Sequence, residues 1–164
     1  MRILAPDASL GQEAFAKDAI NAVIIAAKAN YVVVSRLIDG AKRAFTSANI
    51  DASRTTLIEV AGALEIPLAL KKIASTNHWN AFVVLGAVIK GKTDHYEHVA
   101  RLAQNGVLKV ALEHRLPLGN GILTVHTLEQ AFERADGPCG NLGFDAAKAA
   151  IGLSSLFLQL DKVL

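Results

Sequence analysis

The chain has 164 residues, 52% of them hydrophobic, which predicts a single domain over residues 1–164 and excludes a disordered protein. Its 17 basic and 15 acidic residues leave a formal charge of +2, and no basic cluster indicates a nucleic-acid partner. Cys139 is the only cysteine, the start lacks a signal-peptide pattern, and the apolar runs are too short to span a bilayer, so we expect a cytoplasmic protein without a membrane partner.

Residues 1–20 are expected to form an N-terminal arm, either extended or with one helical turn, because Pro6, Asp7 and Gly11 interrupt them. Beyond them, strand-like apolar runs alternate with helical patterns. The predicted strands are Ala22–Ala27, Thr56–Val60, Ala81–Ala87 and Leu118–Thr124, and the predicted helices are Tyr31–Ser47, Ile66–Ser75, Asp94–His114, Thr127–Ala135 and Phe144–Leu160. This alternation predicts an α/β fold, a flavodoxin-like three-layer sandwich with a central four-stranded parallel sheet and helices on both faces.

Two of these helices require a choice. The run Val32–Val34 is β-branched and resembles a strand, but Leu37, Ile38 and Ala41 continue it at helical spacing, so we predict a helix. The last helix is apolar around much of its circumference, which favours subunit contacts. The alternative is an alanine-rich helix packed on both sides within one monomer.

Ligands of open parallel sheets bind at the carboxyl ends of the strands, where loops lead into helices. Four segments are predicted at that edge: residues 28–30, 61–65 and 86–95, and the start of the loop after Thr124. The segment from Gly86 to Thr93 fits G-x-x-x-x-G-K-[ST], the P-loop pattern that holds nucleotide phosphates. We therefore expect a phosphate to bind there.

A nucleotide-binding P-loop nevertheless fits the sequence poorly. Val88 and Ile89 are successive β-branched residues that belong in a strand, so the loop is expected to begin only at Gly91. The only apolar run that ends in Asp, residues 156–161, is predicted as helix rather than as the strand that a Mg²⁺ site requires. A P-loop enzyme remains the remote alternative, and it predicts Mg²⁺-dependent nucleotide binding.

Several motifs together indicate a different phosphate-binding family. They are Val60-Ala61-Gly62-Ala63-Leu64-Glu65-Ile66-Pro67, the segment from Leu85 to Tyr96, Gly121-Ile122-Leu123-Thr124, and Glu129–Ala135 with Gly140-Asn141 following. In order and spacing they resemble the 6,7-dimethyl-8-ribityllumazine synthases over roughly residues 22–160. The resemblance implies a transferase of riboflavin synthesis that condenses 5-amino-6-(D-ribitylamino)uracil with 3,4-dihydroxy-2-butanone 4-phosphate, releasing phosphate and water, without metal or organic cofactor.

The resemblance also implies roles for individual residues. His95 matches the proton-transfer histidine, Glu65 the residue that binds the ribityl chain, and Arg134 a phosphate-binding arginine from an adjoining subunit. The full set of expected substrate-binding residues is Ala29, Asn30, Ala63, Leu64, Glu65, Ala87, Val88, Ile89, Lys92, Thr93, Asn120 and Arg134. The family assembles at least as pentamers, and the short turn from Asp136 to Asn141 leaves a sixty-subunit capsid open.

Elementary chemistry supports some of these roles and supplies alternatives for others. Thr93 suits a helix N-cap beside an anion, and an imidazole such as that of His95 exchanges protons near neutral pH. Glu65 has a second interpretation, as a cap of the helix that begins at Ile66. His95 and His98 are one helical turn apart, but no third ligand has suitable spacing, so we expect no metal.

Some positions depart from the family pattern. Ala29 stands where Phe or Trp usually stacks on the pyrimidine, and losing that stacking weakens binding by roughly 1 kcal/mol or more. Ala61, Lys92, Asn120 and Leu142 also differ from the commoner residues. A family relative that forms a shell but has lost catalysis, acting as a scaffold or flavin-binding protein, is therefore the second hypothesis.

Overall fold

The computed structural model describes residues 20–163, so nearly all of the predicted N-terminal arm lies outside the described residues. In chain order the elements are β1 (Ala22–Ala27), α1 (Tyr31–Ser47), η2 (Ala52–Arg54), β2 (Thr55–Val60), η3 (Ala63–Glu65), α2 (Ile66–Ala74), β3 (Ala81–Ile89), α3 (His95–His114), β4 (Leu118–Val125), α4 (Leu128–Ala135) and α5 (Leu142–Leu160). The predicted alternation of strands and helices is confirmed.

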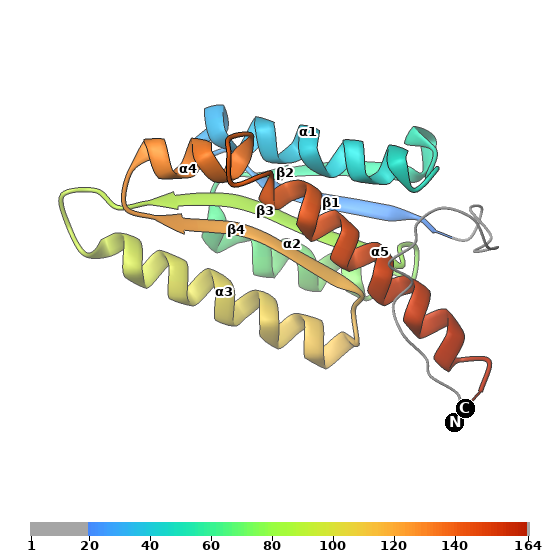
Figure 1. The fold of residues 1–164 in the computed structure, drawn as a ribbon. Coiled ribbons are helices and arrows are strands. Elements are labelled where there is room, and N and C mark those ends of the chain that lie inside the picture. The colour runs from blue at the N-terminus through green and yellow to red at the C-terminus, as the bar shows by residue number, and fades with distance from the viewer. Residues whose placement is uncertain (1–19, 164) are drawn as a thin grey trace, which may run out of the picture.

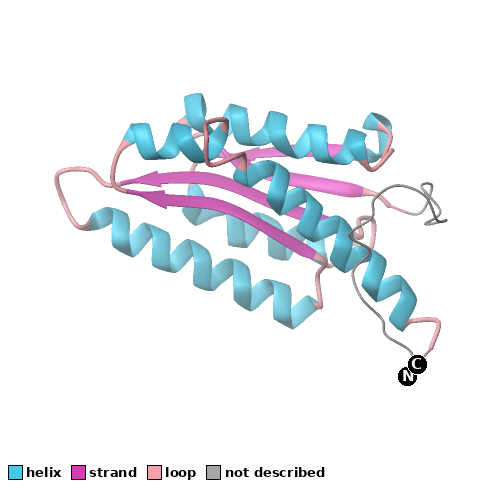
Figure 2. Cartoon of the chain, viewed as in Figure 1, coloured by secondary structure: helices cyan, strands magenta, loops and turns pink. Residues whose placement is uncertain are grey.

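The four strands form one parallel sheet in the order β2-β1-β3-β4. Helices α2 and α3 cover one face of the sheet, and α1, α4 and α5 cover the other (Figures 1 and 2). This arrangement confirms the predicted three-layer, flavodoxin-like sandwich. The chain leaves β1 toward β2 and then crosses back to β3 on the other side of β1, so a topological switch point lies between β1 and β3.

The core consists of two apolar layers that share the central strands. Successive side chains of a strand point to opposite faces, so Ala22, Ile24 and Ala26 of β1 pack in the layer under α1, α4 and α5. Val23, Ile25 and Ala27 pack in the layer under α2 and α3. Burial on both faces explains why β1 and β3 are almost continuous apolar runs in the sequence.

Most predicted boundaries are within one residue of the observed ones, and the helical interpretation of Val32–Val34 is confirmed. Two boundaries differ more. β3 continues through Val88 to Ile89, because these residues keep pairing with Thr124 and Val125 of β4. This outcome agrees with the argument that the two β-branched residues belong in a strand. α5 begins at Leu142 rather than Phe144, because Asn141 caps the helix there.

The two halves of α5 differ in how well this chain covers them. Gly143, Ala147, Ala150 and Ile151 are buried, so the first half packs within the monomer. The apolar residues of the last two turns, Leu153, Leu156, Phe157, Leu158 and Leu160, are only partly buried. The monomer interpretation therefore describes the first half, and subunit contacts of the second half stay a prediction. No helix within residues 20–163 combines the length and apolar character needed to cross a membrane.

Candidate active site

A cavity of about 370 Å³ lies where β1 and β3 end, at the topological switch point of the sheet. It is lined by Ala29, Asn30, Gly62, Ala63, Leu64, Glu65, Ala87, Val88, Ile89, Gly91, Thr93, His95, Tyr96 and Val99. These residues come from the ends of three strands and the starts of the helices that follow them. Open α/β sheets bind ligands at this position, so the cavity is the candidate active site.

Most residues predicted from the sequence lie in this cavity. Its wall includes Ala29, Asn30, Ala63, Leu64, Glu65, Ala87, Val88, Ile89, Thr93 and His95 from the predicted set. Lys92 lies in the same loop, between two lining residues, but is not part of the wall. Thr93 and His95 are exposed, so the cavity opens to solvent at the loop that follows β3. In Figure 1 this loop extends beyond the ends of the strands.

Three helices begin at the cavity, and within the described residues none of them has a side-chain hydrogen bond that caps its start. They are α1 after Asn30, α2 after Glu65 and α3 after Asp94. The first N–H groups of a helix lack partners inside the helix and carry partial positive charge. Three uncapped starts around one cavity therefore make it a favourable place for an anion or for several hydrogen-bond acceptors.

At the start of α1, the N-cap residue Asn30 uses its side chain for a contact with β3 and not to cap the helix. Asn30 has the left-handed conformation, with φ 55° and ψ 41°, which asparagine tolerates better than most residues. Its side-chain Nδ2 donates a hydrogen bond of 2.8 Å to the carbonyl oxygen of Ala87 in β3. This bond ties the loop after β1 to the end of β3 and fixes two walls of the cavity relative to each other.

The N-cap role predicted for Thr93 is wrong, and the one considered for Glu65 is confirmed in position only. The N-cap of α3 is Asp94, and the Thr93 hydroxyl accepts only a long bond, 3.4 Å, from the N–H of His95, because the turn after Gly91 leaves one more residue before the helix. Glu65 does occupy the N-cap position of α2, but its exposed carboxylate makes no capping hydrogen bond. Both side chains therefore remain available to a ligand.

Gly62, Gly91, Tyr96 and Val99 line the cavity but were absent from the predicted set of site residues. Tyr96 is partly buried, its ring lies 5.5 Å from the Lys90 Nζ, and the His126 ring packs edge-on at 6.1 Å. Val99 lies one helical turn after His95, so the spacing i, i+4 was the signal that places both on one side of α3. Tyr96 supplies an aromatic wall to a cavity in which Ala29 supplies none.

Two predicted residues lie outside the cavity. Asn120 is exposed on the edge strand β4, where it pairs with Val84 of β3; its Nδ2 donates to Gln104 Oε1 at 2.5 Å and its Oδ1 accepts from the N–H of Ile122 at 3.0 Å. Arg134 is in the last turn of α4 and is exposed. The chain by itself therefore does not bring these two residues together with His95.

A polar cluster flanks the cavity at the ends of β1 and β2. The Lys28 Nζ lies 3.7 Å from the Glu59 carboxylate, and both side chains are partly exposed. The negative charge of Glu59 raises the pKa of the Tyr31 phenol above its ordinary value, and a hydrogen bond between the two side chains acts in the same direction. Tyr31 is therefore neutral at physiological pH and is excluded as a proton acceptor there.

The described residues contain no obvious metal site. Nowhere in residues 20–163 do three His, Cys, Asp or Glu side chains gather in an arrangement that would hold an ion. The ring Nδ1 of His98 lies 3.3 Å from the Arg101 guanidinium, so this histidine has a protein partner. The cavity instead offers an imidazole, a carboxylate, a hydroxyl and open N–H groups, a set suited to binding a phosphorylated polar substrate and moving protons.

Comparison with known proteins agrees with this geometry. The model of the family described as 6,7-dimethyl-8-ribityllumazine synthase matches residues 19–157. The chain is 40% identical over 138 residues to a 6,7-dimethyl-8-ribityllumazine synthase of Coxiella burnetii, covering 84% of this chain and 91% of that protein. Proteins of the same name are 39% identical over 137 residues in Campylobacter concisus (84% and 88% covered) and 40% over 140 in Leuconostoc mesenteroides (85% and 90% covered). The family match spans every lining residue of the cavity.

Proposed function

Because the chain belongs to the 6,7-dimethyl-8-ribityllumazine synthase family, we propose that it condenses 5-amino-6-(D-ribitylamino)uracil with 3,4-dihydroxy-2-butanone 4-phosphate. The products are 6,7-dimethyl-8-ribityllumazine, phosphate and water, and the enzyme is a transferase of riboflavin synthesis. The observation that carries the proposal is the cavity at the switch point, where three uncapped helix starts surround an imidazole and a carboxylate.

The phosphate of the four-carbon substrate belongs at the start of α3. Gly91 has no Cβ and no neighbour crowds the place where one would be, so a phosphate can approach the backbone there. The Thr93 hydroxyl and the open N–H group of Tyr96 donate to its oxygens, the N–H of His95 can exchange its long bond to Thr93 for one to the phosphate, and the positive end of the helix stabilises its charge. Lys92 in the same loop adds an exposed cation.

His95 is the proposed proton-transfer residue. It is the first residue of α3 and part of the cavity wall, so a phosphate bound as proposed would have its imidazole as a neighbour. The amine of the uracil attacks the substrate ketone, and the resulting carbinolamine loses water to form an imine. Phosphate then leaves by elimination, and ring closure loses a second water. Loss of each water requires a proton on the departing oxygen, which an imidazolium supplies, whereas phosphate leaves as an anion when the adjacent carbon gives up its proton to a base.

The uracil and its ribityl chain belong at the other side of the cavity. The Glu65 carboxylate accepts hydrogen bonds from ribityl hydroxyls, since it is not engaged in capping α2. Leu64, Val88 and Ala29 offer apolar surface to the ring. Holding the amine and the ketone side by side supplies a large part of the rate acceleration.

The active site is proposed to be completed by a second copy of the chain. Arg134 and Asn120 lie outside the cavity of their own chain, so in this proposal a neighbouring subunit supplies them to the phosphate and to the ring. The outer faces of α2 and α3 expose Leu68, Leu102, Leu108 and Leu112, apolar surface suited to subunit contact. We propose at least a pentamer, with a sixty-subunit capsid as the larger form, in the cytoplasm.

The test mixes purified protein with both substrates and follows lumazine absorbance, while light scattering reports the assembly. The His95→Ala variant is expected to form product about 100-fold more slowly at unchanged assembly size, the typical contribution of a general acid. Equal rates would remove the proton-transfer role of His95. A large assembly that makes no product would instead favour the scaffold hypothesis, and Mg²⁺-dependent ATP binding would favour the P-loop alternative.

A further inference from the structure

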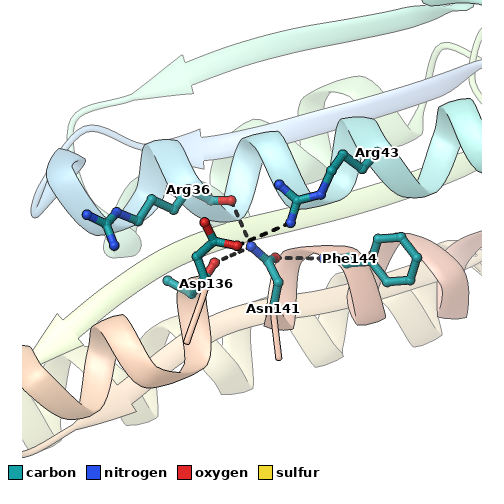
Figure 3. A network of polar contacts seen from close by, with 6 residues as sticks. Arg36, Arg43, Asp136, Asn141 and Phe144 are labelled. Carbon is teal, nitrogen blue, oxygen red and sulfur yellow. Dashed lines mark hydrogen bonds and ion pairs between the residues drawn. The ribbon is translucent and has the colours of Figure 1, made fainter. Parts of the chain in front are cut away.

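A buried amide joins three helices on the face of the sheet that α1, α4 and α5 cover (Figure 3). Asn141 is only 8% exposed, and its Nδ2 donates to the carbonyl oxygen of Arg36 in α1 at 2.9 Å and to that of Ala135, the last residue of α4. Its Oδ1 accepts from the N–H of Phe144 at 3.0 Å, which caps α5. One side chain therefore fixes the end of α4, the middle of α1 and the start of α5 together.

The amide of Asn141 packs against α1 at Gly40. A Cβ atom at Gly40 would overlap the Asn141 side chain, so the absence of a side chain there is what lets the amide lie against α1. The Arg36 carbonyl that accepts from Asn141 lies one turn earlier in the same helix. The amide has little freedom to move, because Gly40, against which it packs, and all three of its bonding partners belong to helices.

The clamped end of α4 is the end that carries Arg134, the residue immediately before Ala135. Other contacts lie nearby: the Arg36 guanidinium is 4.4 Å from the centre of the Phe132 ring, and the exposed Arg43 pairs with Asp136, the residue after α4, at 3.4 Å. The N–H of the exposed Cys139 also donates to the carbonyl oxygen of Glu133 at 3.2 Å. Among the described residues, Asn141 adds a buried side-chain bond to the backbone of this last turn, at its final residue Ala135.

We propose that Asn141 is a positioning residue for phosphate binding. Its amide holds the last turn of α4 so that Arg134 presents its guanidinium to the butanone phosphate in the cavity of a neighbouring subunit. This inference rests on the proposed function, which gives Arg134 that role. A guanidinium binds phosphate well only when its two donors meet two oxygens, so a small rotation of the last turn weakens the contact.

The decisive variant is Asn141→Ser, because serine still caps α5 but is too short to reach the carbonyl oxygens of Arg36 and Ala135. We expect its KM for butanone phosphate to rise about tenfold, while the KM for ribitylaminouracil stays within about twofold. Arg134→Ala is expected to raise the same KM, and the double variant Arg134→Ala/Asn141→Ser no further than Arg134→Ala alone, since both changes act through one contact. Arg43→Ala, which removes the exposed ion pair with Asp136 just after α4, is the control and should leave both KM values unchanged.

A second pair of variants separates positioning from general stability. Asn141→Ala loses both the cap of α5 and the bonds to the carbonyl oxygens of Arg36 and Ala135, and adding Gly40→Ala fills the space that the amide leaves. The double variant should therefore regain thermal stability while its KM for butanone phosphate stays raised. A KM that recovers together with the melting temperature, or equal rises for both substrates, would overturn the inference and leave the enzyme assignment intact. An unchanged KM in Arg134→Ala would overturn it together with the role of Arg134, although wild-type product formation would still support the proposed reaction.

Discussion

The α-helix starts within residues 20–163 fall into two groups. α1, α2 and α3 begin at the cavity without a side-chain cap, whereas α4 and α5 begin outside it and are capped by Thr127 and Asn141. At α4 the Thr127 hydroxyl accepts from the N–H of Gln130, whose own side chain bonds back to the N–H of Thr127. A cap of this kind stabilises a helix by about 1 kcal/mol. The protein therefore forgoes that stabilisation where the open N–H groups can serve a ligand.

Replacing a glycine beside each kind of helix start with alanine should show the largest difference in the free energy of unfolding. A Cβ at Gly143, in the first turn of the capped α5, would overlap the backbone carbonyl of Leu37 in α1, so Gly143→Ala must push two helices apart. We expect it to lower the free energy of unfolding by about 3 kcal/mol. Gly91→Ala, before the open α3, meets nothing within 4 Å and should change it by less than about 0.5 kcal/mol.

Denaturant unfolding at one fixed protomer concentration measures both glycine variants, since assembly makes stability depend on concentration. The phosphate loop adds a second readout, because a methyl group at Gly91 lies where the substrate phosphate is proposed to approach. Gly91→Ala should therefore raise the KM for butanone phosphate without lowering stability. Similar stability losses in the two variants would mean that the open start is as tightly packed as the capped one.

The carboxylate at the open start of α2 is expected to act on substrate alone. Glu65→Gln removes the charge that strengthens hydrogen bonds to the ribityl hydroxyls, so we expect a loss of binding of about 2 kcal/mol, or roughly a 30-fold higher KM for ribitylaminouracil. The unfolding midpoint should not move, because the carboxylate makes no capping bond. Asp39→Asn, which changes an exposed carboxylate on α1, is the matched control. A clear drop in stability for Glu65→Gln would contradict the division between open and capped starts.

Much of the fold was predictable from the sequence because burial on both faces leaves a simple pattern. The central strands are continuous apolar runs, and Val32–Val34 continues into Leu37 at helical spacing, so local signals and tertiary packing agree. The start of α5 was misplaced by two residues. A turn rich in glycine and proline hides the fact that Asn141 is buried and bonded to α1 and α4, which are distant in sequence.

Prediction of the candidate site from the sequence was limited in the same way. Spacing and the edge rule for parallel sheets bring Glu65, Thr93 and His95 to one cavity, since strand ends position them. The cap of α3 was wrongly placed on Thr93, because a one-residue difference in a turn leaves no trace in composition. Asn120 and Arg134 were predicted for the site by resemblance alone, and nothing in the strand and helix pattern says which subunit's cavity they would serve.

Substitution of Thr127, at the capped start of α4, and of Thr93, before the open start of α3, tests the difference between the two groups of helix starts. Thr127→Ala removes the cap of α4 and should cost about 1 kcal/mol of stability without a selective effect on either substrate. Thr93→Ala removes a hydroxyl whose only bond within the described residues is the long contact to His95, so it should raise the KM for butanone phosphate about fivefold at unchanged stability. Steady-state kinetics gives the KM for butanone phosphate of each variant, and thermal unfolding gives the stability of each. A stability loss in Thr93→Ala equal to that in Thr127→Ala would show that α3 is capped after all.

The smallest expected effect concerns pH at the capped start of α4. A hydrogen bond from its own backbone N–H lowers the pKa of Glu129 below its ordinary value of 4.5, and the Thr127 hydroxyl acts in the same direction. Because the pKa is lower in the folded state, the ionised carboxylate stabilises the fold above pH 4.5, and this contribution is lost as the pH falls through the lowered value. Thermal unfolding between pH 6 and pH 3, roughly, should therefore show the stability difference between wild type and Glu129→Gln shrinking toward the acid end. Solvent screening at this exposed position keeps the difference small, and Thr127→Ala should reduce it further by removing one of the two bonds. A difference that grows on acidification would mean that the carboxylate opposes the capped start instead of supporting it.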